Sequence, residues 1–396
     1  MDIPQPAPHH LYVHVPFCRL VCAYCDFVTV GGRAAEIPRY VDALRVELAA
    51  RPAPGELRTI YFGGGTPSLL SGDQVGRVIG AARERWERIA LDEVTVEANP
   101  SEREGPDWDG LRGAGVTRVS LGAQSLRDQE LATLARGHTG REVRRAIGAA
   151  RAAGFDNVSL DLIYGIPGQS LEDWRDGLRM ALELEPEPDH LSCYALQLAL
   201  VPDEWAAPPR PGALRWRSRV AQRQDDKLAT EQYQLAEELL AGAGYRHYEL
   251  SSWARPGFES AHNSAYWARS AYTGIGAGAH SYDGAVERSW NVRDLDRYLG
   301  IVEAGERPLA DREALDAETR AFEAIALGLR RVDGIERLGF AEEFGQDPVQ
   351  RFADRIGEGG EMSRLLEWDT DHLRLTPRGR LFASEACLAF LPEPVA

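Results

Sequence analysis

The chain is 396 residues long, and 44% of its residues are hydrophobic and 27% are charged. This length is too great for one ordinary compact domain, unless the fold is a large barrel that carries an extra module. Acidic side chains outnumber basic ones by 61 to 45, so the formal net charge is -16. A surface of this charge repels phosphate backbones and anionic lipids, which argues against a general nucleic-acid or membrane-surface binder.

No apolar run in the sequence approaches the roughly 20 residues that cross a bilayer. The N-terminal stretch MDIPQPAPHH also lacks the basic start and apolar segment of a signal peptide. We therefore expect a cytoplasmic protein with no integral membrane segment, whose only association with membranes would be a loose one through its partners. Thiols stay reduced in that compartment.

The first 200 residues repeat one pattern, in which a short β-branched run is followed by a loop and an amphipathic helix. Six runs are expected to form strands: Leu11–Phe17, Thr59–Phe62, Glu93–Glu97, Arg118–Leu121, Asn157–Leu162 and His190–Leu196. Strands that alternate with helices predict an α/β fold with a parallel sheet and right-handed crossovers. Six βα units are two fewer than a complete eightfold barrel needs, so we expect an incomplete (βα)6-type barrel.

Composition and element order divide the chain into three expected parts. Residues 1–200 would form the partial barrel, residues 201–307 a barrel extension, and residues 308–396 a C-terminal module. In the last part, helices precede LLEWDTDHLRLTPRGRLFAS, which suggests a two-stranded wing and a terminal helix, the order of a winged helix. The module is acidic, so it is a poor DNA reader, and we expect it to pack against the barrel or a partner.

Polar or glycine-containing motifs occur at or directly after the ends of five of the six expected strands. In chain order they are the cysteine loop, GGGTP, EANP, GAQ and DLIYGIPG. In parallel barrels, the loops at the carboxyl ends of the strands build the active site. The position of these motifs therefore predicts an enzyme-like site at one edge of the sheet.

Three of the five cysteines lie in CRLVCAYCDF, with the spacing Cys-x3-Cys-x2-Cys: Cys18, Cys22 and Cys25. In a reducing compartment, clustered cysteines are more often metal ligands than disulfides. Three thiolates on one loop can bind three irons of a [4Fe-4S] cubane and leave the fourth iron open for a chelating ligand. The alternative is a three-cysteine zinc site with an outside ligand, although zinc sites usually use paired Cys-x2-Cys hooks. Cys193 and Cys387 are distant and have apolar neighbours, so we expect them to be buried small hydrophobes.

The motifs together resemble those of radical S-adenosylmethionine (SAM) proteins. The branch that they resemble contains oxygen-independent coproporphyrinogen III oxidase and the related haem chaperones. The resemblance covers nearly the whole chain, through YVHVPFC, CAYCDF, FGGGTPS, VEANP, SLGAQS, LARGH, DLIYGIPGQ and the C-terminal module. It implies that SAM chelates the open iron through its amino and carboxylate groups. It also implies that the cluster, reduced by a cytosolic electron donor, cleaves SAM to a 5′-deoxyadenosyl radical.

Some SAM-binding positions have a physical reason of their own. Gly63–Gly65 lets the backbone approach a ligand without a Cβ atom, although such a triplet is more often just a turn. Glu97 could accept an ammonium group or two ribose hydroxyls, although it could equally be an ordinary loop carboxylate. Matched position by position, the resemblance places family SAM contacts on Tyr12, Tyr24, Gly64, Gly65, Thr66, Glu97, Gln124, Arg136, Asp161 and Ala195.

Two departures within the family favour the haem chaperones over the oxidases. The oxidase motif has a fourth cysteine two residues after the third, where this chain has Phe27. The chaperones carry a His-Asn-x-x-Tyr-Trp motif associated with haem binding, and it is complete here as His262, Asn263, Tyr266 and Trp267. On a helix His262 and Tyr266 share one face, where an imidazole beside flat rings suits axial ligation and stacking of a porphyrin. The alternative is a hydrogen-bonded histidine packed beneath aromatic residues.

The resemblance thus implies a protein that binds haem and delivers it to recipient haem proteins, with a [4Fe-4S] cluster and SAM as cofactors. The alternative is an oxygen-independent coproporphyrinogen III oxidase, which converts propionates to vinyl groups by oxidative decarboxylation through the 5′-deoxyadenosyl radical. A radical-SAM enzyme with another substrate is a third possibility. The sequence leaves open whether the chain is an enzyme.

Overall fold

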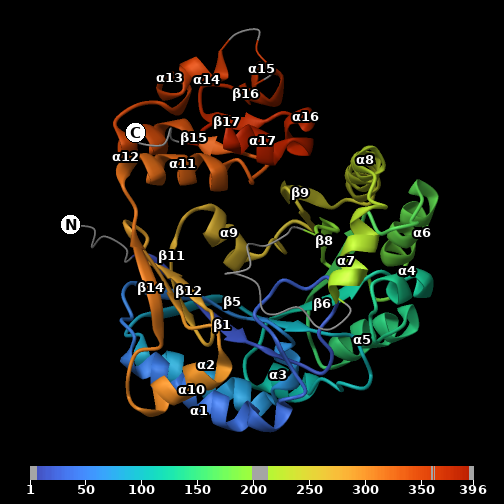
Figure 1. The fold of residues 1–396 in the computed structure, drawn as a ribbon, viewed down its shortest axis with the longest axis vertical. Coiled ribbons are helices and arrows are strands. Elements are labelled where there is room, and N and C mark those ends of the chain that lie inside the picture. Colours follow the sequence, from blue (N-terminus) through green and yellow to red (C-terminus); the bar gives the residue numbers. More distant parts are fainter. Residues whose placement is uncertain (1–6, 199–212, 358–359, 361, 392–396) are drawn as a thin grey trace.

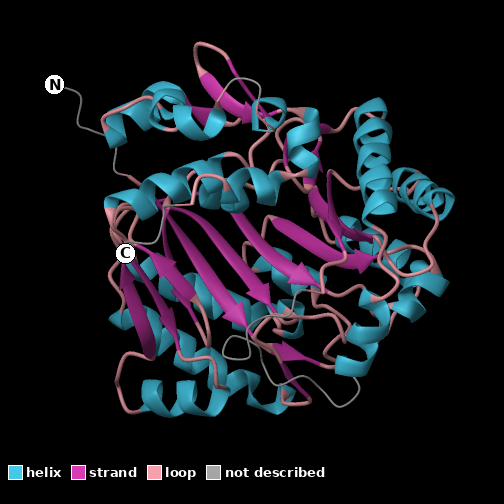
Figure 2. Cartoon of the chain, turned by 45° about the horizontal axis from the view of Figure 1, so that its top comes forward, coloured by secondary structure: helices cyan, strands magenta, loops and turns pink. Residues whose placement is uncertain are grey.

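A twelve-stranded, mostly parallel sheet organises the computed structural model, which describes residues 7–198, 213–357, 360 and 362–391 (Figure 1). The boundary expected at residue 200 lies outside the described residues. The strand order is β14-β13-β12-β11-β1-β4-β5-β6-β7-β8-β10-β9. Figure 2 shows these strands in the middle of the molecule with helices around them.

Six adjacent strands of this sheet run parallel and coincide with the six runs predicted from the sequence. They are β1 (Pro8–Val15), β4 (Glu56–Gly64), β5 (Ile89–Ala98), β6 (Arg118–Gln124), β7 (Asn157–Tyr164) and β8 (His190–Ala195). The helices between them are α1 (Ile37–Ala50), α2 (Gly72–Arg85), α3 (Trp108–Gly113), α4 (Asp128–Thr133), α5 (Gly140–Ala152) and α6 (Leu171–Leu182), with the short turns η1 (Ala34–Glu36) and η2 (Pro67–Leu69). Over the described residues the sheet stays open, so the prediction of an incomplete barrel is confirmed.

Local sequence explains where these elements begin. Ser71 and Gln74 form a capping box at the start of α2, and Thr139 and Glu142 form one at the start of α5. Each box satisfies backbone N–H groups that the first helical turn leaves without partners. In β1 nearly every residue is buried, as expected for a central parallel strand that is covered on both faces.

The chain from residue 213 onward widens the sheet at both edges. β11 (Ala271–Ile275) pairs parallel to β1, and β12 (His280–Tyr282), β13 (Glu287–Asn291) and β14 (Leu309–Ala314) follow as antiparallel strands. At the other edge, β10 (Ser252–Ala254) and β9 (Arg246–Glu249) continue from β8. The helices of this part are α7 (Ala213–Ala221), α8 (Asp226–Gly242), α9 (Ala261–Trp267) and α10 (Leu295–Glu303). β14 belongs to the large sheet although it lies beyond residue 307.

The C-terminal module has its own apolar core, which includes Ile325, Phe340, Phe352, Leu373 and Phe390. Its elements are α11 (Ala317–Gly328), β15 (Ile335–Glu336), α12 (Arg337–Phe344), α13 (Pro348–Arg351), α14 (Ala353–Ile356), α15 (Met362–Leu365), β16 (Leu366–Trp368), β17 (His372–Leu375), α16 (Pro377–Leu381) and α17 (Ala383–Leu388). Helices followed by the antiparallel pair β16 and β17 give the predicted winged-helix order. In Figure 1 the module lies above the sheet, on the side opposite α1, α2 and α10, and α9 lies between.

Among the described helices, none is both long and apolar enough to cross a bilayer.

Candidate functional site

The three clustered cysteines lie on one loop that is held at both ends. Cys18 ends the two-residue strand β2 (Phe17–Cys18), which pairs parallel with β3 (Val30–Gly31). Between these strands, the Cys25 amide donates to the Cys22 carbonyl at 3.2 Å. The loop therefore presents three half-buried thiols next to the carboxyl end of β1.

An arginine that the sequence analysis did not single out fixes this loop from α7. The guanidinium of Arg217 donates to the Ala23 carbonyl at 3.0 Å and to the Cys25 carbonyl at 2.9 Å, and it pairs with Asp26. The sequence gives no periodic signal for this contact, because Arg217 is nearly 200 residues away along the chain. It closes the cysteine loop against the barrel extension.

Burial disfavours the thiolate forms of Cys18 and Cys25. Burial, with smaller effects from Cys25 and Cys22, raises the pKa of Cys18 to about 12, and burial raises the pKa of Cys25 to about 11. Metal ligands must be thiolates, so iron binding would release protons here. Within the described chain, three or more metal-ligating side chains nowhere converge on a single-ion site. In a cubane each thiolate binds a different iron, so the cysteines need not converge on one point.

The glycine triplet after β4 lies directly against the cysteine loop and β1. Gly64 has φ +114°, and a Cβ there would lie 2.5 Å from Cε1 of His14. A Cβ on Gly65 would lie 2.7 Å from the Phe17 carbonyl oxygen and 2.8 Å from the Pro16 carbonyl group. Thr66 then donates to Sγ of Cys18 at 3.7 Å. Glycine is required here because backbone and ring atoms fill the space of a side chain.

Gly65→Ala should therefore destabilise the protein and lower its capacity for iron. The new methyl meets backbone atoms directly before Cys18, and we expect a loss of about 2 kcal/mol or more in the free energy of unfolding. Denaturant unfolding and iron content after reconstitution measure the two effects. The matched control is Gly80→Ala in α2, where a Cβ meets nothing within 4 Å among the described residues and should stabilise the helix by about 0.5–1 kcal/mol.

Two half-buried carboxyl groups lie on β5 and β7, and the first of them contacts the glycine triplet directly. Glu97 accepts from the Tyr61 hydroxyl at 2.8 Å and from the Gly64 amide at 3.0 Å. Burial raises the pKa of Glu97 to about 7, although both hydrogen bonds act in the opposite direction. Asp161 accepts from the Ser120 hydroxyl at 3.2 Å, and burial raises its pKa as well. Carboxyl groups held in this way can accept ammonium or hydroxyl donors of a ligand.

A buried arginine, which the sequence motifs did not indicate, lies between these carboxyl groups. Arg118 begins β6 and is 1% exposed, and its charge acts against the burial-induced rise in the pKa values of both Glu97 and Asp161. A charged residue at the start of the otherwise uncharged strand RVSLGAQ was the available signal. We infer that it keeps the two acids ionisable inside the barrel.

Arg136 connects the cysteine loop to the end of β6. Its guanidinium donates to Sγ of Cys22 at 3.2 Å, to the Tyr24 hydroxyl at 3.3 Å, and to the Gly122 carbonyl at 2.7 Å. Gln124, the last residue of β6, has φ +66°, a conformation that a non-glycine residue keeps only under strong constraint. Ala195 ends β8, beside Tyr164 of β7. The structure thus brings the predicted cluster and SAM residues together on the side of the sheet where the parallel strands have their carboxyl ends.

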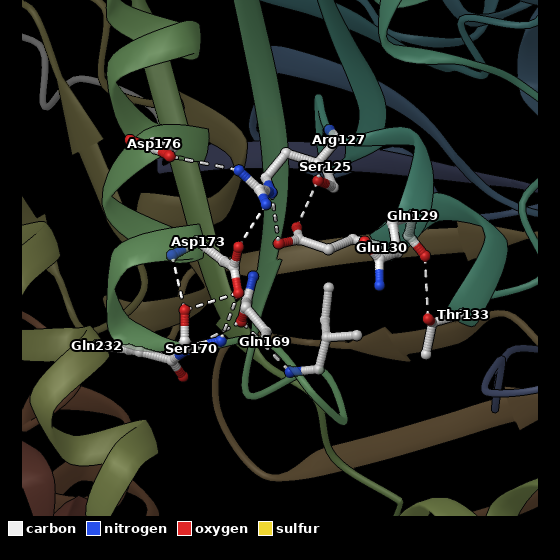
Figure 3. A network of polar contacts seen from close by, with 11 residues as sticks. Ser125, Arg127, Gln129, Glu130, Thr133, Gln169, Ser170, Asp173, Asp176 and Gln232 are labelled. Atoms are coloured by element: carbon white, nitrogen blue, oxygen red, sulfur yellow. Dashed lines mark hydrogen bonds and ion pairs between the residues drawn. The ribbon is translucent and has the colours of Figure 1, made fainter.

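A polar network fixes the loops that follow β6 and β7 (Figure 3). Arg127 pairs with Asp173 and Asp176, and so joins the loop after β6 to α6. Gln232 of α8 accepts from the Gly165 amide at 2.9 Å and donates to Gln169 at 3.0 Å. These contacts join the segment before α4 to α6, and the loop after β7 to α8.

The His-Asn-x-x-Tyr-Trp motif lies in α9, which packs against β4 and β5. His262 is 0% exposed, and its ring stacks on Tyr61 with centroids 4.9 Å apart. Its Nδ1 is 2.7 Å from the Thr59 hydroxyl, and its Nε2 is 3.0 Å from the Tyr266 hydroxyl. Both ring nitrogens are therefore engaged, and haem ligation by His262 requires one of these hydrogen bonds to break.

Trp267 lies apart from His262 and faces the C-terminal module. The guanidinium of Arg330 lies 4.4 Å above the Trp267 ring. The motif thus divides between two environments: His262 lies against the barrel strands, whereas Trp267 lies against the residues after α11. Tyr266 contacts both His262 and the extension strand β11, through Tyr272.

Comparison with known proteins shows two family matches and several relatives of nearly full length. Residues 12–181 match the radical SAM superfamily, and residues 315–382 match the HemN C-terminal domain. The chain is 38% identical over 391 residues to a protein of Mycobacterium tuberculosis (H37Rv) named heme chaperone HemW, which covers 96% of this chain and 94% of the relative. The Escherichia coli (K12) protein of the same name is 33% identical over 397 residues, covering 98% and 99%.

A solved structure shares the fold. Coproporphyrinogen III oxidase (HemN) from Escherichia coli superposes with a TM-score of 0.80 over 98% of this chain and 91% of that one, at 24% identity. At that identity the likeness concerns the fold alone.

A mouse protein named radical S-adenosyl methionine domain-containing protein 1, mitochondrial, is 38% identical over 97% of this chain and 87% of its own length.

Proposed function

The chain belongs to the haem chaperone HemW family of radical SAM proteins, and on that basis we propose that it binds haem and delivers it to recipient haem proteins. The observation that carries the proposal is identity of 33–38% with proteins named heme chaperone, over nearly the whole chain. The position of Phe27 supports it. This side chain is 66% exposed on the cysteine loop, at the position where the oxidases have their fourth cysteine.

We propose a [4Fe-4S] cluster held by Cys18, Cys22 and Cys25, with SAM beside it. Two observations support this set: the thiols share one held loop, and Nε of Arg136 is buried without a partner among the described residues. The SAM contacts would come from Tyr12, Tyr24, Gly64, Gly65, Thr66, Glu97, Gln124, Arg136, Asp161 and Ala195. When bound, the cluster and SAM would supply reductive cleavage of the sulfonium. The chain would work in the cytoplasm, where thiols stay reduced, with an electron donor of that compartment.

The raised pKa of Glu97 gives a pH dependence that tests its role. If only the ionised carboxylate binds SAM, affinity should fall by about tenfold between pH 8 and pH 6, because a group with a pKa of about 7 loses most of its charge there. Glu97→Gln should bind SAM weakly and with little pH dependence, as calorimetry on the reconstituted protein would measure.

The free energy of unfolding should change with pH in the opposite direction to the SAM affinity. Because the pKa of Glu97 is higher in the folded protein than in the unfolded chain, the stability that Glu97 contributes is present at low pH and is lost as pH rises through about 7. Glu102→Gln, an exposed carboxyl change, is the control; an unchanged pH slope in Glu97→Gln would remove Glu97 from the SAM site.

The rival function, coproporphyrinogen III oxidation, shares the fold and needs the same cofactors. The two functions separate in one experiment on anaerobically reconstituted protein. We expect stoichiometric haem binding, transfer of that haem to an apo-haem protein, and no conversion of coproporphyrinogen III to protoporphyrinogen with SAM and a reductant. Turnover without haem binding would overturn the proposal and assign the chain to the oxidases.

A further inference from the structure

A cavity of about 320 Å³ lies between α9, the strands of the extension and the C-terminal helix α11. Its lining residues come from all three parts: Tyr266, Arg269, Ser270, Tyr272, Tyr282, Arg288, Glu323 and Leu327. In Figure 1, α9 lies between the sheet and α11. The volume is at the lower end of the range for ligand pockets, about 300–1,000 Å³. It would hold part of a large ligand rather than enclose it.

The walls of the cavity are suited to a flat ring. Tyr266 and Tyr272 stand edge to face with centroids 4.8 Å apart, and Leu327 adds an apolar surface from α11. Apart from Tyr282, which is 8% exposed, the lining residues are half-buried, so the cavity reaches solvent. Aromatic walls of this kind favour planar conjugated ligands.

At one end of the cavity, an arginine has a hydrogen-bond donor without an acceptor. Arg269 has φ +57°, a strained conformation directly after α9. Its two terminal nitrogens bind Glu343 at 2.9 and 3.0 Å, whereas its Nε is buried with no partner in the described part of the chain. Nearby on the same junction, Trp267 Nε1 and Arg330 Nε are also buried without a partner among the described residues. A buried donor without an acceptor is costly, so this end favours an acceptor-bearing ligand.

The other charged groups of the cavity restrict where an anion could lie. Arg288 is already paired with Glu323 at 2.8 Å and with Glu313 at 2.8 Å. Glu323 itself lines the cavity and would repel a carboxylate at that end. Arg269 is also paired, with Glu343, but its Nε has no partner among the described residues, so a ligand carboxylate is favoured near Arg269 over Arg288.

We propose that this cavity is where one edge of haem binds, with its conjugated ring against Tyr266, Tyr272 and Leu327 and a propionate at Arg269. The inference rests on the proposed haem function and gives that function a place. Tyr266 is both a wall of the cavity and the partner of His262 Nε2, so the cavity lies on the Nε2 side of the imidazole. The C-terminal module, through α11, thereby forms part of the haem site.

The first test fills the cavity. Leu327→Trp should weaken haemin binding to the full-length protein by about tenfold or more, measured by titration of the Soret band. Leu338→Trp is the matched control, because Leu338 is 66% exposed on α12 and does not line the cavity. Circular dichroism and cluster content should be unchanged in both variants. Equal haemin affinity in Leu327→Trp and wild type would overturn the proposal that haem binds in this cavity.

The second test separates a carboxylate contact from a structural ion pair. Arg269→Met and Glu343→Gln both break the ion pair that joins the segment after α9 to α12, but only the first removes the donor. Glu343→Gln also breaks the pair of Glu343 with Arg320 of α11, so it is the more disruptive change to the ion pairs. We expect about tenfold weaker haemin binding in Arg269→Met and none of this loss in Glu343→Gln. Wild type should also bind haemin dimethyl ester, which lacks free propionates, about tenfold more weakly than haemin, and Arg269→Met should not distinguish the two.

The outcomes distinguish the two proposals. Equal losses in Arg269→Met and Glu343→Gln would show that the ion pair is structural and would overturn the propionate contact. Haemin bound normally by all variants would overturn the cavity while leaving the haem function intact. Failure of the wild-type protein to bind haemin at all would overturn the proposed function itself.

Discussion

Cys18→Ala, Cys22→Ala and Cys25→Ala should each abolish the [4Fe-4S] cluster, seen as loss of bound iron and of the broad absorption near about 400 nm after anaerobic reconstitution. Each thiolate would hold a different iron, so no two cysteines can replace the third. Arg136, which donates to Sγ of Cys22, cannot replace a ligand either, because a guanidinium has no lone pair available for iron.

The other two cysteines provide the matched controls. Cys193 is 1% exposed in β8, and Cys387 packs against the core of the C-terminal module. Cys193→Ala and Cys387→Ala should therefore keep the full iron content and lose only some stability. If Cys193→Ala lost iron as completely as the loop variants, a fourth cysteine would close the cluster. The prediction of an open iron, and with it the prediction of a SAM site, would then be wrong.

The parallel core of the fold could be predicted from the sequence because each unit repeats the same local pattern. A β-branched run buried on both faces, such as Leu11–Phe17, has few alternatives to a central strand. The extension could not be predicted in this way. β11 pairs parallel with β1 across about 260 residues, and short strands such as β10 and β12 owe their structure to that pairing rather than to their own composition.

The candidate site shows the same difference between residues with a local sequence pattern and contacts made by distant parts of the chain. Residues on the cysteine loop and the strand ends could be located because the topology brings strand ends together. Contacts made from distant elements could not. Arg217 reaches the cysteine loop from α7, and Arg118 lies between acids on neighbouring strands. Neither has a local sequence pattern that indicates its partner.

The motif around His262 shows a further limit. Helical spacing correctly predicts that His262 and Tyr266 face each other, but it does not reveal what lies on the other side of the ring. The Glu93 carboxylate accepts from the first amides of α9, and Thr59 binds Nδ1 of His262 from β4. These contacts hold the helix in the barrel and leave His262 neutral, since burial lowers its pKa well below the usual value.

His262→Ala should consequently have two separable effects. Removing a fully buried ring that stacks on Tyr61 and bonds to Thr59 and Tyr266 should lower the free energy of unfolding by about 2–4 kcal/mol. Haem affinity should also fall, without loss of the cluster, because a neutral imidazole is the axial ligand that the motif offers. His262→Gln distinguishes these effects. Its amide can keep one of the two hydrogen bonds, so it should lose less stability than the alanine variant while binding haem just as weakly and with a shifted Soret band. Wild-type haem affinity and an unshifted band in His262→Gln would make His262 a structural residue of the barrel. Haem ligation would then have to come from elsewhere, and Tyr266, which already borders the cavity, would be the first residue to replace.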